Sequence, residues 1–169
     1  MIIPIIISII SILLDGLLTN YLPYQIGNLS LFTPLLTVVS IFIIYPFYKK
    51  KVKNYFIHIF ILGIIYDLLY TNLLFFNGVV FMIIGLVSIF INKNYNLGYI
   101  RILIYTLIVI VLYESLTSFI FILFNLVPIT IDNIIYKITH TIILNIIYME
   151  LLFIIIKLLP KNLKKISIN

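Results

Sequence analysis

The chain of 169 residues is strongly apolar: 64% of its residues are hydrophobic, 9% are charged, and its mean hydropathy is +1.29. Soluble domains carry roughly 25% charged residues, so this composition excludes a water-soluble fold. The absence of cysteine excludes disulfides, thiolate metal sites and cysteine nucleophiles. Long apolar runs such as residues 102–112 lack the alternation of membrane β-strands. We therefore expect an all-α integral membrane protein.

Six apolar stretches predict one domain, residues 1–169, built as a bundle of about six transmembrane helices. The first stretch has no basic segment before it and no small-residue cleavage site after it, so we expect it to be retained and not removed as a signal peptide. The third and fourth stretches are short and are compatible with either a full or a re-entrant hairpin. The predicted spans are residues 2–22, 29–48, 55–70, 77–91, 99–124 and 134–159.

The positions of the basic residues predict the orientation of these spans. Ten of the eleven lysines and arginines lie in three segments, residues 49–53, 93–101 and 157–165, which fall on the same side of the predicted membrane. Because Lys and Arg accumulate in cytoplasmic loops, we expect a multi-pass protein of the bacterial cytoplasmic (inner) membrane with both termini in the cytoplasm. The net charge of +6 then indicates membrane topology and contact with anionic lipid, with no nucleic-acid binding.

Ionisable side chains inside the spans are the main candidates for function, since each costs about 2.5–3.5 kcal/mol at the bilayer centre. Asp15, Asp67, Glu114 and His140 all fall in the predicted outer half of the bilayer. One interpretation is that they hydrogen-bond across helices and hold the bundle together. Another is an outward-facing polar cavity for a small molecule or a partner's transmembrane helix. A proton or ion pathway is disfavoured, because only Glu150 continues the series inward.

Polar and small residues recur at helical spacing within the spans, and we expect these stripes to face the interior of the bundle. Gly63, Gly78 and Gly85 are expected to allow close helix packing, with Asn77 and Asn145 as further packing residues. The stripes are Ser8, Ser11, Asp15 and Thr19; Gly63 and Asp67; Gly78, Gly85, Ser88 and Asn92; Glu114, Thr117 and Ser118; and Lys137, Thr141, Asn145 and Tyr148.

Asp67 is the strongest single candidate, because it stands one helical turn after Gly63 near the end of the third span. A buried carboxylate needs hydrogen-bond donors. Thr71, Asn77 and the backbone amides that open the fourth helix lie at a similar depth, and such amides carry the positive end of a helix dipole. We therefore predict that Asp67 braces the hairpin between the third and fourth spans.

Enzymatic motifs are absent from the sequence. It contains no Gly-rich phosphate loop, no H-E-x-x-H metal motif and no G-x-S-x-G nucleophile elbow. His58 and His140 are predicted on opposite sides of the bilayer, so they cannot share a metal ion. We expect no catalysis, no metal and no cofactor.

The third and fourth spans resemble a known family. Residues 63–71, with Gly-x-x-x-Asp at a span end, followed by Asn77 opening the next helix, resemble the bacterial rod-shape protein family MreD. The family usually has a glycine where this sequence has Phe75-Phe76. The resemblance implies a non-enzymatic membrane subunit of the machinery that elongates the cell wall, acting through its helix faces. Its implied partners are an MreC-like single-span protein, an MreB-like filament and the glycan polymerase and transpeptidase complex.

A second family of similar architecture remains an alternative. Vitamin-binding S-components of energy-coupling-factor transporters are also six-helix membrane bundles of this size, and their outward-facing pocket would suit the outer cluster of ionisable residues. S-components dock on their transporter through small residues of the first span, typically alanines. This chain has no alanine and offers only Ser8 and Ser11 there.

Overall fold

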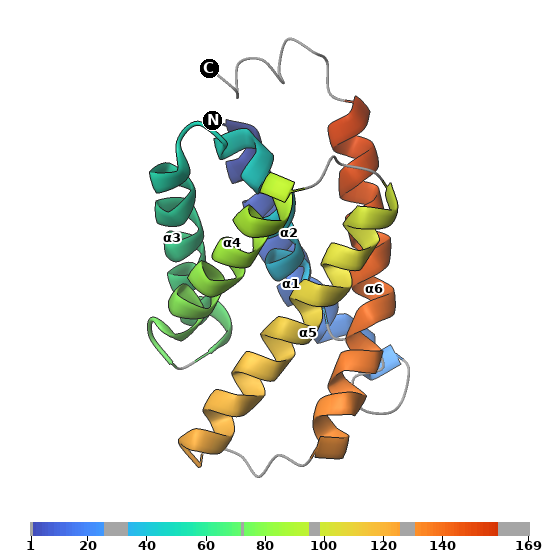
Figure 1. Ribbon diagram of the computed structural model, residues 1–169. Helices are drawn as coiled ribbons and strands as arrows, with labels where there is room; N and C mark the ends of the chain where they lie inside the picture. The colour runs from blue at the N-terminus through green and yellow to red at the C-terminus, as the bar shows by residue number, and fades with distance from the viewer. Residues whose placement is uncertain (1, 26–33, 72, 95–98, 126–130, 159–169) are drawn as a thin grey trace.

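The computed structural model describes residues 2–25, 34–71, 73–94, 99–125 and 131–158, and these residues form helices with no β-strand among them (Figure 1). The expectation of an all-α fold is thereby confirmed. In chain order the elements are α1 (Ile2–Gln25), α2 (Leu36–Ile44), the 3-10 helix η1 (Tyr45–Tyr48), α3 (Val52–Tyr70), α4 (Phe76–Asn94), α5 (Tyr99–Leu123) and α6 (Ile131–Leu158).

Four of the described helices are long and apolar enough to cross a membrane, namely α1, α3, α5 and α6. The apolar segments Leu36–Tyr48 and Phe76–Asn92 are shorter. The second span, predicted for residues 29–48, is helical in its described part only from Leu36. Its N-cap residue Leu35 has φ −128° and ψ 40°, outside the helical region, and follows Pro34. Residues 29–33 of this predicted span lie outside the described residues.

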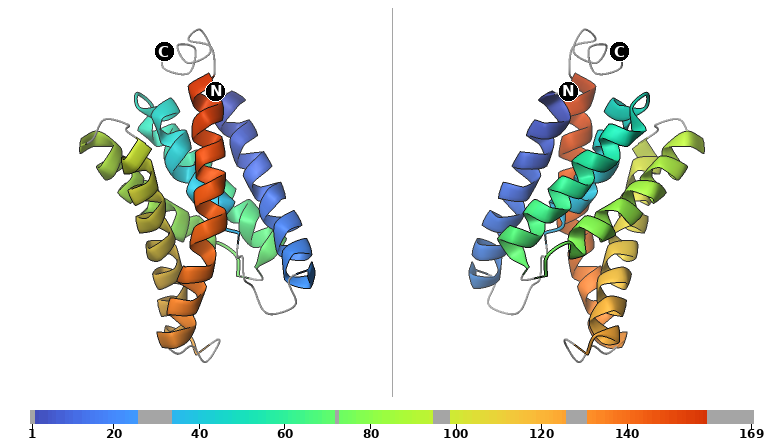
Figure 2. Two further views of the ribbon diagram at one scale, coloured as in Figure 1. Left: turned by 90° about the vertical axis from the view of Figure 1, so that its right-hand side faces the viewer. Right: turned by 90° about the vertical axis from the view of Figure 1, so that its left-hand side faces the viewer.

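Successive helices run in opposite directions through the bundle (Figures 1 and 2). The start of α1, the corner between η1 and α3, and the last turns of α4 and α6 lie at the same end. We call this the basic end, because the described chain there includes the lysines of residues 49–53, the basic positions 93 and 101, and Lys157. Lys137 lies in α6, nearer the opposite end.

The core is built around α2. Every residue of this helix is buried, and it packs against α1, α4, α5 and α6. The pairs α3–α4 and α5–α6 pack as hairpins around it. On the outer faces of the longer helices, large apolar side chains such as Leu17, Phe90 and Ile155 are exposed. Exposure of these faces to water would cost free energy. Exposure to lipid chains would not, because lipid chains are as apolar as the side chains themselves.

Tyrosine hydroxyl groups cross-link the helices. Tyr55 and Tyr105 are buried and Tyr70 is exposed, and each of the three uses a backbone carbonyl of a neighbouring helix as hydrogen-bond acceptor. Each of these bonds fixes the depth of one helix against another. The hydroxyls of Tyr55, Tyr70 and Tyr105 donate to the carbonyl oxygens of Ile41, Ile12 and Ile91 at 3.0, 2.6 and 3.1 Å.

Candidate functional site

Asp15 provides the cap for the start of α2. It lies in the middle of α1 and is only 2% exposed. The backbone N–H groups of Leu36 and Thr37 donate to its two carboxylate oxygens at 2.7 and 2.9 Å. The first amides of a helix have no partner within the helix, and α2 has no side-chain cap of its own. A carboxylate from α1 therefore meets the positive end of the α2 dipole.

Asn145 of α6 completes this cap. Its Oδ1 accepts a hydrogen bond from the N–H of Leu35 at 2.9 Å, and its Nδ2 donates to the carbonyl of Thr141 at 2.6 Å. Side chains from two other helices thus bind three consecutive amides. The sequence predicted a packing role for Asn145 but missed this arrangement. The available signal was Pro34 followed by leucines, with no Ser, Thr, Asp or Asn at the cap position.

Asp67 joins α3 to α4 in the way that the sequence predicted. Asp67 and Asn77 are both fully buried. The Thr71 hydroxyl and the Asn77 side-chain amide donate to Oδ1 of Asp67 at 2.8 and 2.7 Å, and the Asn77 backbone N–H donates to Oδ2 at 2.9 Å. The Tyr113 hydroxyl of α5 donates to Oδ1 of Asn77 at 2.9 Å. The predicted brace of the hairpin is confirmed, and α5 is bonded to it.

Glycine makes this joint possible. A Cβ atom added to Gly63 would lie 2.5 Å from Cα and 2.6 Å from N of Gly78, so α3 and α4 are in backbone contact there. Gly78 and Gly85 instead face side chains of α3. The approach at Gly63 allows Asp67, one turn later, to reach Asn77.

Three of the four ionisable residues of the predicted outer cluster, Asp15, Asp67 and Glu114, are buried in the interior of the bundle. Asp67 is linked through the side chain of Asn77 to the hydroxyl of Tyr113, the residue that precedes Glu114 in α5. Glu114 itself is buried in α5. His140 is placed differently: it is partly exposed on α6, and its Nδ1 lies 3.2 Å from the Oγ1 of the exposed neighbour Thr139.

Most residues of the predicted polar stripes are buried, with one correction. Thr19 is exposed on α1, although it shares a stripe with Asp15. Its hydroxyl donates to the Asp15 carbonyl of its own helix at 2.7 Å, so this group is satisfied without facing the interior. The side chain of Lys137 lies outside the described residues. The buried members are Ser8, Ser11, Asp15, Gly63, Asp67, Gly78, Gly85, Ser88, Asn92, Glu114, Thr117, Ser118, Thr141, Asn145 and Tyr148.

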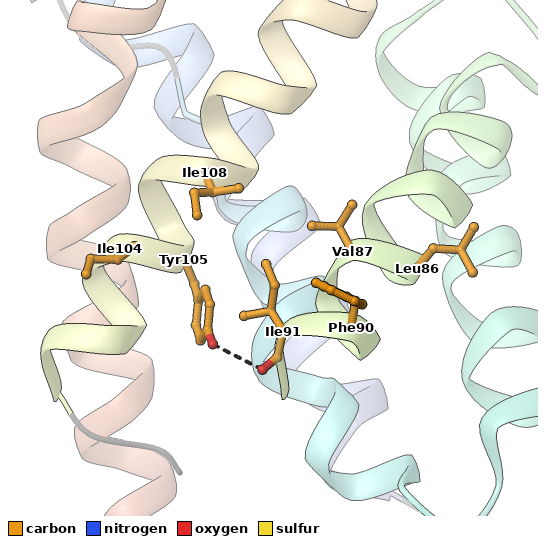
Figure 3. Close-up of a pocket in the computed structure, with 7 residues that line it drawn as sticks. All are labelled: Leu86, Val87, Phe90, Ile91, Ile104, Tyr105 and Ile108. Atoms are coloured by element: carbon orange, nitrogen blue, oxygen red, sulfur yellow. Dashed lines mark hydrogen bonds between the residues drawn. The ribbon is translucent and has the colours of Figure 1, made fainter. Parts of the chain in front are cut away.

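A groove of about 770 Å³ lies between α4 and α5 (Figure 3). Its lining is aliphatic and aromatic, and the hydroxyl of Tyr105 is bonded to the Ile91 carbonyl. Such a surface can hold apolar chains but supplies no group for acid–base chemistry. Over the described part of the chain, no three His, Cys, Asp or Glu residues are grouped so as to hold a metal ion. The lining residues are Leu86, Val87, Phe90, Ile91, Ile104, Tyr105 and Ile108.

No protein-family model, no curated protein and no solved structure matches this chain. The resemblance to MreD proteins therefore rests on the features of this sequence itself: residues 63–81, Asp15-Gly16, Pro34, the basic segment before the third span, and the length and predicted topology of the chain.

Proposed function

We propose that this protein is a non-enzymatic, multi-pass subunit of the bacterial cell-wall elongation machinery, with a role like that of MreD proteins. The observation that carries the proposal is the joint between α3 and α4. Gly63, Asp67 and Asn77, on which the resemblance rests, meet there in backbone contact and hydrogen bonding. A short sequence pattern whose members form one buried joint is better explained as a family feature than as a chance match.

The hydrogen bonds that the Asp15 and Asp67 carboxylates accept favour a structural role for these residues over a role in a ligand pocket. Both oxygens of Asp15 and both oxygens of Asp67 accept hydrogen bonds from the start of a neighbouring helix. In an S-component, polar groups of the outer half would instead be directed at a vitamin. Side chains used to fix helix positions support a protein that acts through the shape of its helix faces.

The proposal includes six spans in the bacterial cytoplasmic membrane, with the basic end in the cytoplasm. It is supported by the alternating direction of the helices, which brings the basic positions of three separate segments to one end. In this orientation the basic end would face an MreB-like filament. The opposite end and the helix faces would be available to an MreC-like single-span protein and to the glycan polymerase and transpeptidase complex.

The proposal is tested by depleting the protein in its rod-shaped host. We expect cells to swell and round, and the tagged protein to co-purify with a single-span periplasmic partner. Complementation by wild type should restore the rod shape, whereas a variant that breaks the α3–α4 joint should not. Depletion that leaves shape intact and abolishes uptake of one vitamin would replace this proposal with the S-component function.

A further inference from the structure

A second groove, between α1 and α3, changes character along its length. It has a volume of about 510 Å³ and is open to the outside of the bundle. Its polar lining residues, Ser8, Tyr48, Asn54 and His58, all lie toward the basic end, beside the aliphatic Ile5 and Ile57. Farther along α3 its lining is aliphatic, with Ile61 and Ile65. A groove whose polar side chains are confined to one end, and whose remaining lining is aliphatic, matches the profile of an amphipathic molecule.

The polar part of this groove is held by a chain of hydrogen bonds across three elements. The Ser8 hydroxyl donates to the Pro4 carbonyl at 2.9 Å, so Nε2 of His58 is the donor to Ser8 Oγ at 3.1 Å. Nδ1 then accepts from the Tyr48 hydroxyl at 2.6 Å. These bonds connect α1, α3 and η1 and fix the walls of the groove before anything enters it.

Four exposed lysines lie in the chain between Tyr48 and Asn54, two residues that line the groove at the basic end. Lys49, Lys50 and Lys51 precede α3, and Lys53 lies in its first turn, next to Asn54. Positive charge at the N-terminus of a helix opposes the helix dipole, so these lysines do not stabilise α3. Clusters of four to eight basic residues beside a transmembrane helix attract anionic lipid headgroups.

We propose that this groove binds one anionic phospholipid, with its phosphate among the lysines and one acyl chain along Ile61 and Ile65. The length of the groove supports a lipid over a partner's transmembrane helix. From Asn54 to Ile65 the α3 axis advances about 16 Å. That is close to one leaflet, half of a hydrocarbon core of about 30 Å, whereas a spanning helix would need a groove along the whole core.

The test uses the delipidated full-length protein in detergent, titrated with dioleoylphosphatidylglycerol or with dioleoylphosphatidylcholine and measured by native mass spectrometry. We expect the first phosphatidylglycerol to bind more tightly than phosphatidylcholine. Replacing two lysines, Lys51→Gln with Lys53→Gln, should weaken phosphatidylglycerol binding about 30-fold, because each lysine contributes about 1 kcal/mol. The double variant Lys93→Gln with Arg101→Gln removes the same charge at the same end and should leave this binding unchanged.

A second variant tests the groove itself. Ile61→Trp fills the aliphatic part from an exposed position and keeps every lysine, so it should abolish the tight phosphatidylglycerol site. Ile143→Trp, at an exposed position of α6, is its control and should bind as wild type does. The proposal is overturned if both lipids bind equally, if the lysine variant binds as wild type does, or if the Lys93 and Arg101 variant loses as much affinity. Unchanged binding by Ile61→Trp would overturn it too and would leave the groove to a partner's helix.

Discussion

Two buried aspartates act as helix caps supplied from another helix. Asp15 and Asp67 each accept the backbone amide that opens the next helix in the chain, α2 and α4 respectively. A capping side chain normally lies in the helix that it caps. Here the cap also holds two helices together, so one carboxylate satisfies orphan amides and fixes interhelical geometry. Loss of such a group therefore acts on packing as well as on the helix end.

The loss of stability on substitution of Asp67 should depend on how many hydrogen-bond acceptors the new side chain provides. Asp67→Asn keeps the size and one acceptor oxygen, whereas Asp67→Leu leaves the Asn77 donors buried and unpaired, at about 1–3 kcal/mol each. We expect thermal stability in detergent, expression and complementation of a depletion strain to fall in the order wild type, Asn, Leu. Asp132→Asn, at an exposed position in the first turn of α6, is the control and should lose only the interaction with the helix dipole, about 0.3–1 kcal/mol. Equal stability of Asp67→Leu and wild type would contradict the bracing role.

Asn145 should be as sensitive as the aspartates, although it carries no charge. Asn145→Leu leaves the N–H of Leu35 unpaired at the buried start of α2, which costs about 1–3 kcal/mol. The expected result is a lower melting temperature of the purified protein. Asn20→Leu makes the same chemical change at an exposed position of α1 and serves as the matched control. If both variants melt alike, Asn145 does not contribute to the cap.

At the scale of the helices, the α3–α4 hairpin was the most predictable part of the chain. Gly63, Asp67 and Asn77 are close in sequence, and few hydrogen-bond donors other than Asn77 are near enough to reach the Asp67 carboxylate. Its hydrogen bonds could therefore be predicted. The cap of α2 could not be predicted from the sequence, because Asp15 and Asn145 are far from Leu36 in the chain and no local pattern connects them. In the described part of the second predicted span, Pro34 and Leu35 are not helical and the helix begins at Leu36, although all three residues are apolar. Hydropathy alone does not reveal where the backbone leaves the helix.

The two glycines of the hairpin should differ in their tolerance of alanine. A Cβ on Gly63 would meet the Gly78 backbone at 2.5 Å, which cannot move without separating the helices. A Cβ on Gly78 would meet the ring of Phe60 at 3.2 Å, and a side chain can shift. We expect Gly63→Ala to lower the melting temperature and fail in complementation, whereas Gly78→Ala remains active. Equal behaviour of the two variants would argue against backbone contact at Gly63.

Phe75, in the turn before α4, adopts φ 67°, a left-handed conformation that favours glycine. It stands near the position where MreD proteins usually have glycine. We expect Phe75→Gly to be more stable than Phe75→Ala by about 1 kcal/mol, since both lose the ring and only alanine keeps a Cβ. At the neighbouring Leu74 we expect the opposite order, with Leu74→Ala more stable than Leu74→Gly. Glycine there only increases the conformational freedom of the unfolded chain. Thermal melts of the four variants compare the two positions, and the same order at both would contradict the strain at Phe75.

At the scale of the molecule, composition and charge predicted more than any motif. The apolar content predicted an all-α bundle, and the basic segments predicted which helix ends lie together. Burial of the polar stripes also followed from helical spacing. What the sequence could not predict is the hydrogen-bonded link from Asp67 through Asn77 to Tyr113, because it depends on how three separate helices are rotated.

The orientation can be measured directly, since the chain has no cysteine of its own. Lys51→Cys lies at the basic end, and Asn125→Cys lies just beyond α5 at the other end; both positions are exposed. In intact cells we expect an impermeant thiol reagent to label Asn125→Cys and to leave Lys51→Cys unmodified until the membrane is opened. Labelling of Lys51→Cys in intact cells would reverse the proposed topology.

The cap of α2 has a consequence for biogenesis. Its amides are satisfied by Asp15, made early in synthesis, and by Asn145, made near the end. While the ribosome is still producing the intervening chain, the N–H of Leu35 lacks its native acceptor. A nascent protein released at that stage would hold an unpaired donor in an apolar interior. The cap of the second helix is therefore completed only when the sixth helix has been made and has packed against it.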